Sequence, residues 1–234
     1  MTDELKRAAR WAGWLYLLLV PLGVVGILIM PETILVKGDG AATLANLSQQ
    51  KWIVQIAITS AFLIQIVQLF LALHLRSLLA PVGAFKASLI VWFTVAAMPI
   101  ALLNEMFFVV LLSLDQPEFF LATLTTTQRE ALALSLFQWH ENGIMIAHIF
   151  WGLWLIPMGY LILRSGYLPW VIGGLLLLAG VSYLLDTLVW VYKPHIEFMF
   201  ANLFGWAEVL LPLWLIFKGI NSHIAEQKWT LPTV

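Results

Sequence analysis

The chain has 234 residues, of which 62% are hydrophobic and only 11% are charged, and its mean hydropathy is +0.92. A soluble domain is nearer half apolar and a quarter charged, so this composition predicts a single integral membrane domain over residues 1–234, with little room for a soluble one. The formal net charge of −1 provides no basic face for nucleic acid. The absence of cysteine excludes disulfides, thiolate metal ligands and cysteine nucleophiles.

Six apolar runs follow one another along the chain, and each is long enough to cross a bilayer, which takes about 20 helical residues. The first run is longer than the apolar core of a signal peptide, which favours a retained helix. The third contains Pro99, which predicts a kink or a tilt. The runs predict an all-α polytopic membrane helix bundle with spans at about 11–30, 52–74, 87–113, 142–163, 169–191 and 199–217.

The distribution of positive charge predicts the orientation of these spans. With the N-terminus inside, eight lysines and arginines fall in cytoplasmic segments and four in outer segments, as the positive-inside rule requires. An even number of spans then places the C-terminus inside as well. The inner residues are Lys6, Arg7, Arg10, Arg76, Lys86, Arg164, Lys218 and Lys228, and the outer ones are Lys37, Lys51, Arg129 and Lys193.

Two long outer segments carry signals for helices of their own. The first contains Lys37-Gly38-Asp39-Gly40, a turn signal, and a helix is expected to begin at Ala41. The second contains Thr125-Thr126-Thr127, which offers an N-cap, with Gln128 in the following turn. The side of the protein that carries the longer connecting segments is therefore expected to face outward.

Ionisable side chains inside the predicted spans mark a candidate site, because a charge in hydrocarbon is expensive. With a rise of about 1.5 Å per residue, four of them fall roughly 7 to 14 Å below the outer boundary; these are Glu105, His148, Asp186 and Glu208. Asn104 shares the level of Glu105, and Glu141 precedes His148 by two helical turns on nearly the same face. This common depth predicts an outward-facing polar cavity between the last four spans.

Two other interpretations of these residues remain open. Isolated polar side chains also hold membrane helices together, typically for about 1 kcal/mol each. Alternatively, Glu105, His148, Asp186 and Glu208 are ligand types for zinc or another divalent ion, which would make the protein a metal-dependent, hydrolase-like membrane enzyme. The sequence has no H-E-x-x-H motif and no pair of histidines at i, i+4 spacing. No other cofactor is predicted.

Small residues recur in the fourth and fifth spans. Gly152 and Gly159 lie in the fourth, and Gly173, Gly174 and Gly180 lie in the fifth. Glycines let the backbones of membrane helices approach closely. These glycines therefore permit close helix contact in both spans.

The second half of the fourth span and the turn that follows it have a distinctive sequence, WGLWLIPMGYLILRSGYLP, over residues 151–169. Asp186 and Glu208 follow in the fifth and sixth spans. Together with residues 173–185 and 213–219, the Gly38-Asp39 loop and the Leu79-Ala80-Pro81-Val82 turn, the pattern resembles an uncharacterised bacterial membrane family known as domain of unknown function 4386.

This resemblance covers nearly the whole chain and implies a six-helix protein of the bacterial inner membrane. It supplies no activity. Asp186 and Glu208 match the family pattern, whereas Trp154 stands where many members carry histidine, which weakens histidine-based chemistry of the family type.

The sequence thus predicts a multi-pass membrane protein whose cavity binds a small ligand, a lipid headgroup or a proton-coupled substrate. Membrane lipid and a small molecule are the expected partners, and nucleic acid is not. The pattern leaves open whether the protein is an enzyme, and whether it forms homo-oligomers.

The charge asymmetry makes a prediction about topology. Reporter fusions placed after Arg76, Arg164 and Lys218 should report cytoplasm, and fusions near Asp39 or Gln116 should report the outside. Activity of paired cytoplasmic and periplasmic reporters measures this. A cytoplasmic signal from the Asp39 loop would overturn both the orientation and the depth argument.

Overall fold

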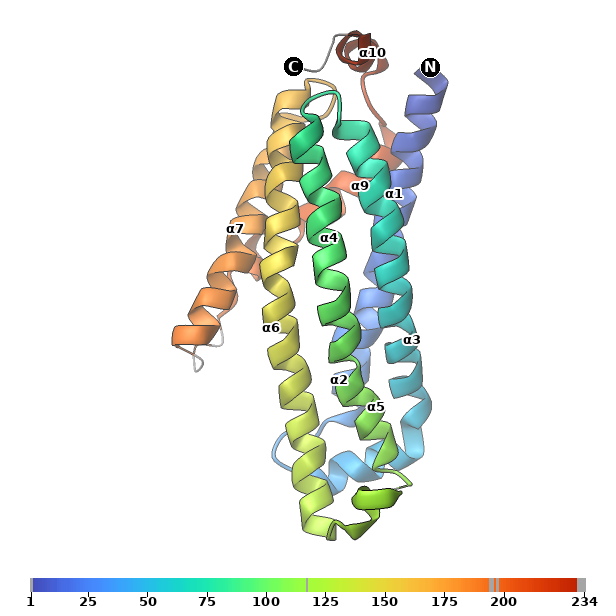
Figure 1. The fold of residues 1–234 in the computed structure, drawn as a ribbon, viewed down its shortest axis with the longest axis vertical. Helices are drawn as coiled ribbons and strands as arrows, with labels where there is room; N and C mark the ends of the chain where they lie inside the picture. The colour runs from blue at the N-terminus through green and yellow to red at the C-terminus, as the bar shows by residue number, and fades with distance from the viewer. Residues whose placement is uncertain (1, 117, 194–195, 197, 231–234) are drawn as a thin grey trace. The chain divides into compact units, whose positions relative to one another are not determined.

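The computed structural model describes residues 2–230 except 117, 194–195 and 197, and these residues form helices and connecting turns without strands (Figure 1). Contacts divide the chain into two compact units. Unit 1 comprises Met1–Leu18, Val67–Met98 and Met145–Val234. Unit 2 comprises Leu19–Ile66 and Pro99–Ile144. Each unit is described by itself.

Five stretches of helix are long and apolar enough to cross a membrane, and they cover the first five predicted spans except Pro169, the first residue of the fifth. They are Leu5–Ile34, Gly40–Leu79, Ala84–Ser113, Thr126–Ser165 and Trp170–Tyr192. The sixth predicted span, 199–217, is instead a shorter broken segment of α8 (Ala201–Phe204) and α9 (Ala207–Phe217). The five stretches support a membrane-embedded helical protein, while a sixth crossing and the inside location of both termini stay predictions.

Two helices extend beyond the predicted spans, because polar capping residues start them in the segments that were predicted to lie outside. α3 runs over Gly40–Leu79, with non-helical angles at Gln50, and Asp39 Oδ1 accepts a hydrogen bond from Ala42 N at 2.9 Å. α6 runs over Thr126–Ser165. At its start Thr125 and Gln128 form a reciprocal capping box, with distances of 2.9 and 3.3 Å. The predicted helix start near Ala41 and the threonine N-cap are confirmed.

The interruption of the third predicted span does not lie at Pro99. That proline sits inside α4 (Ala84–Asn104), and the break falls at Glu105, before α5 (Met106–Ser113) begins. Membrane helices tolerate proline where neighbouring groups satisfy the freed carbonyl. The break therefore coincides with an ionisable residue.

Unit 2 has an apolar core built from short and long helical pieces. A π-helical turn, η1 (Val25–Ile29), and α2 (Met30–Ile34) end the first helical stretch, which begins in α1 (Thr2–Val24). A 3-10 turn, η2 (Phe119–Thr123), precedes α6. The buried core residues are Met30, Ile34, Leu47, Ile53, Val54, Ala57, Ile58, Phe108, Leu111, Leu114, Leu121, Ala133, Leu136 and Phe137.

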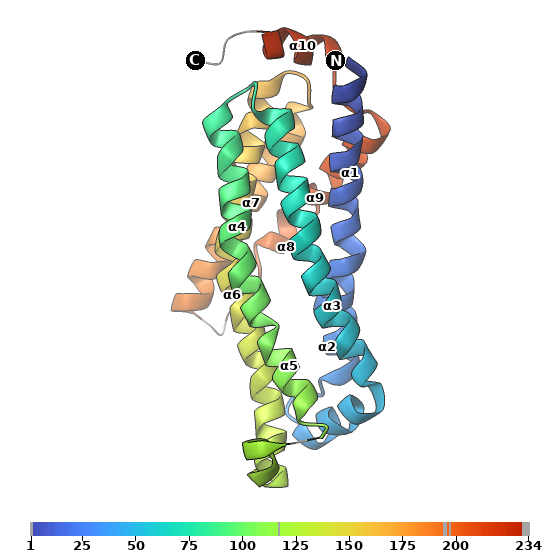
Figure 2. The same ribbon diagram turned by 45° about the vertical axis from the view of Figure 1, so that its right-hand side comes forward.

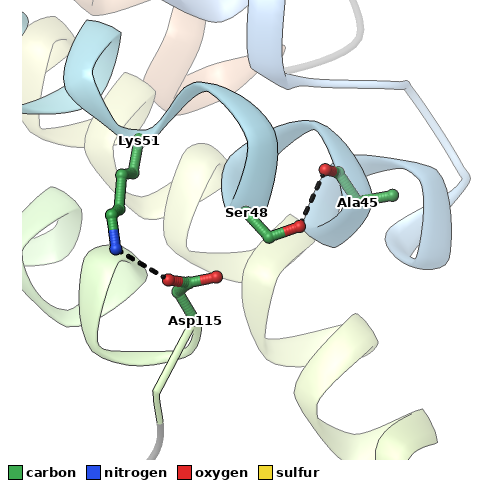
Figure 3. A network of polar contacts seen from close by, with 4 residues as sticks. All are labelled: Ala45, Ser48, Lys51 and Asp115. Carbon is green, nitrogen blue, oxygen red and sulfur yellow. Dashed lines mark hydrogen bonds and ion pairs between the residues drawn. The ribbon is translucent and has the colours of Figure 1, made fainter.

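A polar contact links two segments of unit 2 at its surface (Figure 3). The ammonium group of Lys51 on α3 lies 3.3 Å from Asp115 Oδ2, just after α5. One turn earlier on α3, Ser48 Oγ donates to the carbonyl oxygen of Ala45. Exposed ion pairs of this kind contribute little stability, typically less than about 1 kcal/mol.

Unit 1 is organised by glycine contacts between α6 and α7 (Trp170–Tyr192), which run side by side in Figures 1 and 2. A Cβ atom added at Gly159 would lie 2.6 Å from the carbonyl oxygen of Gly173, and one added at Gly152 would lie 2.6 Å from that of Gly180. The close contact predicted from these four glycines is confirmed. The remaining candidate, Gly174, faces open space.

The turn between α6 and α7 is fixed from two sides. The buried hydroxyl of Tyr167 donates to the carbonyl oxygen of Leu78 on α3 at 2.7 Å. Burial raises the pKa of Tyr167 well above its usual range, so this hydroxyl keeps its proton. On the other side, Asn221 N donates to the Tyr167 carbonyl oxygen at 3.1 Å, just before α10 (Ser222–Thr230) begins.

The glycine contact can be tested by adding one methyl group. Gly159→Ala should lower the free energy of unfolding by about 1 to 3 kcal/mol, because the methyl meets a backbone oxygen that cannot rotate away. Gly174→Ala is the matched control and should be neutral or slightly stabilising, since nothing lies within 4 Å. Thermal unfolding in detergent measures both. Equal melting temperatures for the two variants would contradict the close approach.

Candidate functional site

The carboxyl group of Glu208, in the first turn of α9, is held by two tyrosines from other helices of unit 1. The hydroxyl of Tyr16 on α1 donates to Oε2 at 2.8 Å. The hydroxyl of Tyr183 on α7 donates to Oε1 at 2.9 Å. Tyr16 is buried, whereas Glu208 and Tyr183 are partly buried. One acidic group thus joins three helices.

The position of α9 against α1 follows from a second glycine. A Cβ atom added at Gly13 would lie 2.8 Å from Ile216 and 3.0 Å from the carbonyl oxygen of Pro212. Gly13 therefore brings α9 close to α1. Tyr16 is one helical turn after Gly13, so its hydroxyl reaches the acid on the neighbouring helix.

Further aromatic rings pack around the two tyrosines that hold Glu208. The imidazole of His148 on α6 lies edge-on to Tyr183, with 4.9 Å between ring centroids, and 5.1 Å from Trp151. Trp154, one turn later, lies 5.7 Å from the ring of Tyr16. We call Tyr16, His148, Trp151, Trp154, Tyr183 and Glu208 the Glu208 cluster.

His148 has an unused hydrogen-bonding atom. Its side chain is buried, and among the described residues its Nδ1 atom has no hydrogen-bond partner. A buried polar atom without a partner is costly and calls for an explanation such as an unseen water, ion or proton. His148 thus gives the Glu208 cluster an open donor or acceptor position.

Asp186 has a local structural role in the same unit. Its Oδ1 accepts a hydrogen bond from Phe200 N at 2.6 Å, and its Oδ2 accepts one from Ala201 N at 2.8 Å. These N–H groups belong to the start of α8, which has no other cap among its own side chains. The carboxylate of Asp186 therefore serves as an N-cap contributed by a different helix.

Unit 2 contains a separate polar group around the break in the α4–α5 segment. Glu105 Oε1 lies 3.2 Å from Nε2 of His140 on α6, and both side chains are buried. The neighbouring amide of Asn104 donates to the carbonyl oxygen of His140 at 3.0 Å. The His140 ring stacks on Phe108, with centroids 3.8 Å apart. Glu141 is exposed.

The predicted site residues are thus divided between two units. His148, Asp186 and Glu208 belong to unit 1, while Asn104, Glu105 and Glu141 belong to unit 2. Within unit 1, His148 and Glu208 share contacts with Tyr183, and Asp186 instead caps α8. Tyr16, Tyr183 and the pairing of His140 with Glu105 were not predicted from the sequence. Tyr183, which lies well inside the fifth predicted span, was the available signal.

The described residues contain no group of three or more histidine, cysteine, aspartate or glutamate side chains placed to hold a metal ion. Metal binding at Glu105, His148, Asp186 and Glu208 stays a prediction, to which the distances between the described residues add no support.

Comparison with known proteins identifies the family of this chain. The model of the family described as "Domain of unknown function (DUF4386)" matches residues 11–219. The chain belongs to this family. The match includes all six predicted spans and every member of the Glu208 cluster, and the family's description assigns no activity.

One relative of this DUF4386 chain among the curated proteins is an "Uncharacterized protein" from the archaeon Archaeoglobus fulgidus, 35% identical over 74 residues. The aligned segment is 32% of this chain, and the chain spans 44% of the length of that relative. No solved structure matches the chain.

The capping role of Asp186 leads to a prediction. Asp186→Ala should lower the free energy of unfolding by about 1 to 3 kcal/mol and speed hydrogen exchange in residues 200–204, because two backbone N–H groups lose their acceptor. Asp186→Asn keeps one acceptor oxygen and should fall between the Ala variant and the unmodified chain. Exchange mass spectrometry measures this. Unchanged exchange in the Ala variant would show that Asp186 is not the cap.

Proposed function

We propose that this protein is a six-span inner-membrane protein that binds a small ligand in an outward-facing polar cavity, with proton exchange at Glu208. One observation carries the proposal. The two oxygens of Glu208 are bonded to hydroxyl groups of Tyr16 and Tyr183 from two other helices, and no described ion pair includes this acid.

The absence of a paired cation among the described residues is what favours a proton. A carboxylate inside an apolar segment is expensive unless a charge or a proton compensates it. Two phenol donors stabilise an anionic carboxylate, and a protonated carboxyl can itself donate one bond. The Glu208 cluster therefore supports either state with small movements of hydroxyl hydrogens.

The proton state of Glu208 would control contacts among three helices. In the anionic state both tyrosines donate to the acid, which links α1, α7 and α9. After protonation the carboxyl gains an O–H donor, so one tyrosine hydroxyl can accept a bond from the acid and turn its own hydrogen toward a ligand. The open Nδ1 of His148, whose ring contacts Tyr183, offers a second polar anchor in the same place.

A purely structural role is the competing explanation. Interhelical hydrogen bonds of this kind contribute about 1 kcal/mol each, and an amide would serve as well as an acid. Comparing the acid with its amide therefore separates the two explanations.

We expect Glu208→Gln to remove one titrating carboxyl signal while leaving the fold intact. Glutamine has the same size and can still accept one tyrosine hydrogen bond, so the melting temperature should shift little. Infrared spectra of the protein in lipid nanodiscs, recorded over a pH series, follow the carboxyl C=O band. Glu141→Gln is the matched control, since Glu141 is exposed and lies outside the cluster.

Two outcomes would contradict the proposal. If Glu208→Gln leaves every titrating band unchanged, Glu208 does not exchange protons. If the variant melts far lower while the bands persist, Glu208 is a structural hydrogen-bond partner alone. A Tyr16→Phe variant gives an independent reading, because removing one donor should shift the pH at which the Glu208 band titrates.

A further inference from the structure

A pocket lies in unit 1 where three apolar helices end, and no residue of the Glu208 cluster lines it. It has a volume of about 480 Å³, and is lined by Gly166, Tyr167, Leu168, Pro169, Trp214, Lys218, Gly219, Ile220 and Asn221. These residues come from the turn between α6 and α7, from the last turn of α9 (Trp214) and from the segment that joins α9 to α10. Helix ends of membrane-spanning segments lie at the boundary between hydrocarbon and water.

The lining of this pocket is amphipathic. Leu168, Pro169 and Trp214 form an apolar part, and Lys218 and Asn221 are exposed and polar. Tryptophan and lysine at a helix end are typical of the headgroup level of a bilayer. A ligand that is apolar on one side and charged on the other would match both parts.

Positive charge gathers around the same helix ends. Lys228 of α10 donates to the carbonyl oxygen of Arg164 at 2.6 Å, and Arg164 comes two residues before the pocket lining begins. The ring of Tyr160 faces two cations, with Lys86 Nζ at 5.1 Å and Arg164 Cζ at 5.8 Å from its centroid. The ion pairs Lys51–Asp115 and His140–Glu105 both belong to unit 2.

The geometry points to a binding site for the phosphate-bearing headgroup of an anionic phospholipid. The ammonium group of Lys218 would contact the phosphate, and the apolar part of the lining would contact the carbons nearest the glycerol. Cations at a membrane surface attract anionic lipid, by an amount that corresponds to about a fivefold change in affinity per charge. This site is independent of Glu208 and of its proposed proton exchange.

The segments that line the pocket are fixed by hydrogen bonds within the protein. The Tyr167 hydroxyl donates a hydrogen bond to α3, and the Tyr167 carbonyl oxygen accepts one from Asn221 N, so the two lining segments are bonded to each other. Gly166 and Gly219 have positive φ angles of 74° and 68°, a conformation in which other residues are strained. The lining therefore has a defined shape before any lipid binds.

The test is lipid binding to the delipidated full-length protein, measured by native mass spectrometry with phosphatidylglycerol or phosphatidylcholine added. The unmodified protein should retain phosphatidylglycerol in preference. Lys218→Gln should lower the affinity for phosphatidylglycerol about fivefold, and Lys218→Arg should preserve it. Lys37→Gln, which removes an exposed lysine of unit 2, is the matched control and should have no effect.

A second variant keeps the test decisive if Lys218→Gln is unstable. Asn221→Asp adds a negative charge to the same lining without changing Lys218, and it should also weaken phosphatidylglycerol binding. Equal loss of lipid in the Lys218 and Lys37 variants would overturn the site, as would equal retention of the two lipids. If soluble glycerol 1-phosphate binds as tightly as phosphatidylglycerol, the ligand is a free phosphate ester and the lipid assignment is wrong.

Discussion

Hydrocarbon offers no hydrogen bonds, so each polar group inside the apolar helices of this chain has to find its partner within the protein. Thr94 and Ser182 meet this constraint locally, because their hydroxyls donate to carbonyl oxygens four residues earlier. Asp186 and Glu208 meet it across helices, through backbone N–H groups and tyrosine hydroxyls. Polar side chains therefore determine much of how these helices are placed.

Close backbone approach is the second feature that places the helices of unit 1. The glycine pairs of α6 and α7 bring the two backbones together, and Gly13 brings α9 against α1. Close approach leaves Tyr16 and Tyr183 at hydrogen-bonding distance from the same acid. Bulkier residues at the glycines would separate the helices and with them the two donors. The Glu208 cluster thus depends on small residues that carry no chemistry themselves.

The helical, membrane-embedded character and the positions of five spans were predictable, because apolar composition over about 20 residues is a strong signal. The starts of α3 and α6 were harder to place, since their first turns are polar and are capped by Asp39 and Thr125. The last span was predicted as one helix, and the structure breaks it at Gly205 and Trp206. A hydropathy average taken over about 20 residues does not detect such a break.

The candidate site was predictable only as a set of unusual residues. His148 and Glu208 were predicted because they are ionisable residues inside apolar spans. Their partners are tyrosines, which are uncharged and give no such signal. Tyr16 was missed because aromatic residues near a span end are expected at the interface. His140 and Glu105 are 35 residues apart, and no local pattern reveals their pairing. Asp186 was grouped with the acids by depth, although its partners are the backbone N–H groups of Phe200 and Ala201.

The central claim is that Glu208, bonded to two tyrosines, exchanges a proton. Solid-state NMR of protein labelled with ¹³C at glutamate carboxyl and tyrosine ring carbons tests it most directly. One carboxyl carbon should show close contacts to two tyrosine rings, and its chemical shift should move between the acid and carboxylate positions as pH changes. A tyrosine-contacting carboxyl carbon that keeps one chemical shift over the whole pH range in which the protein stays folded would contradict the claim.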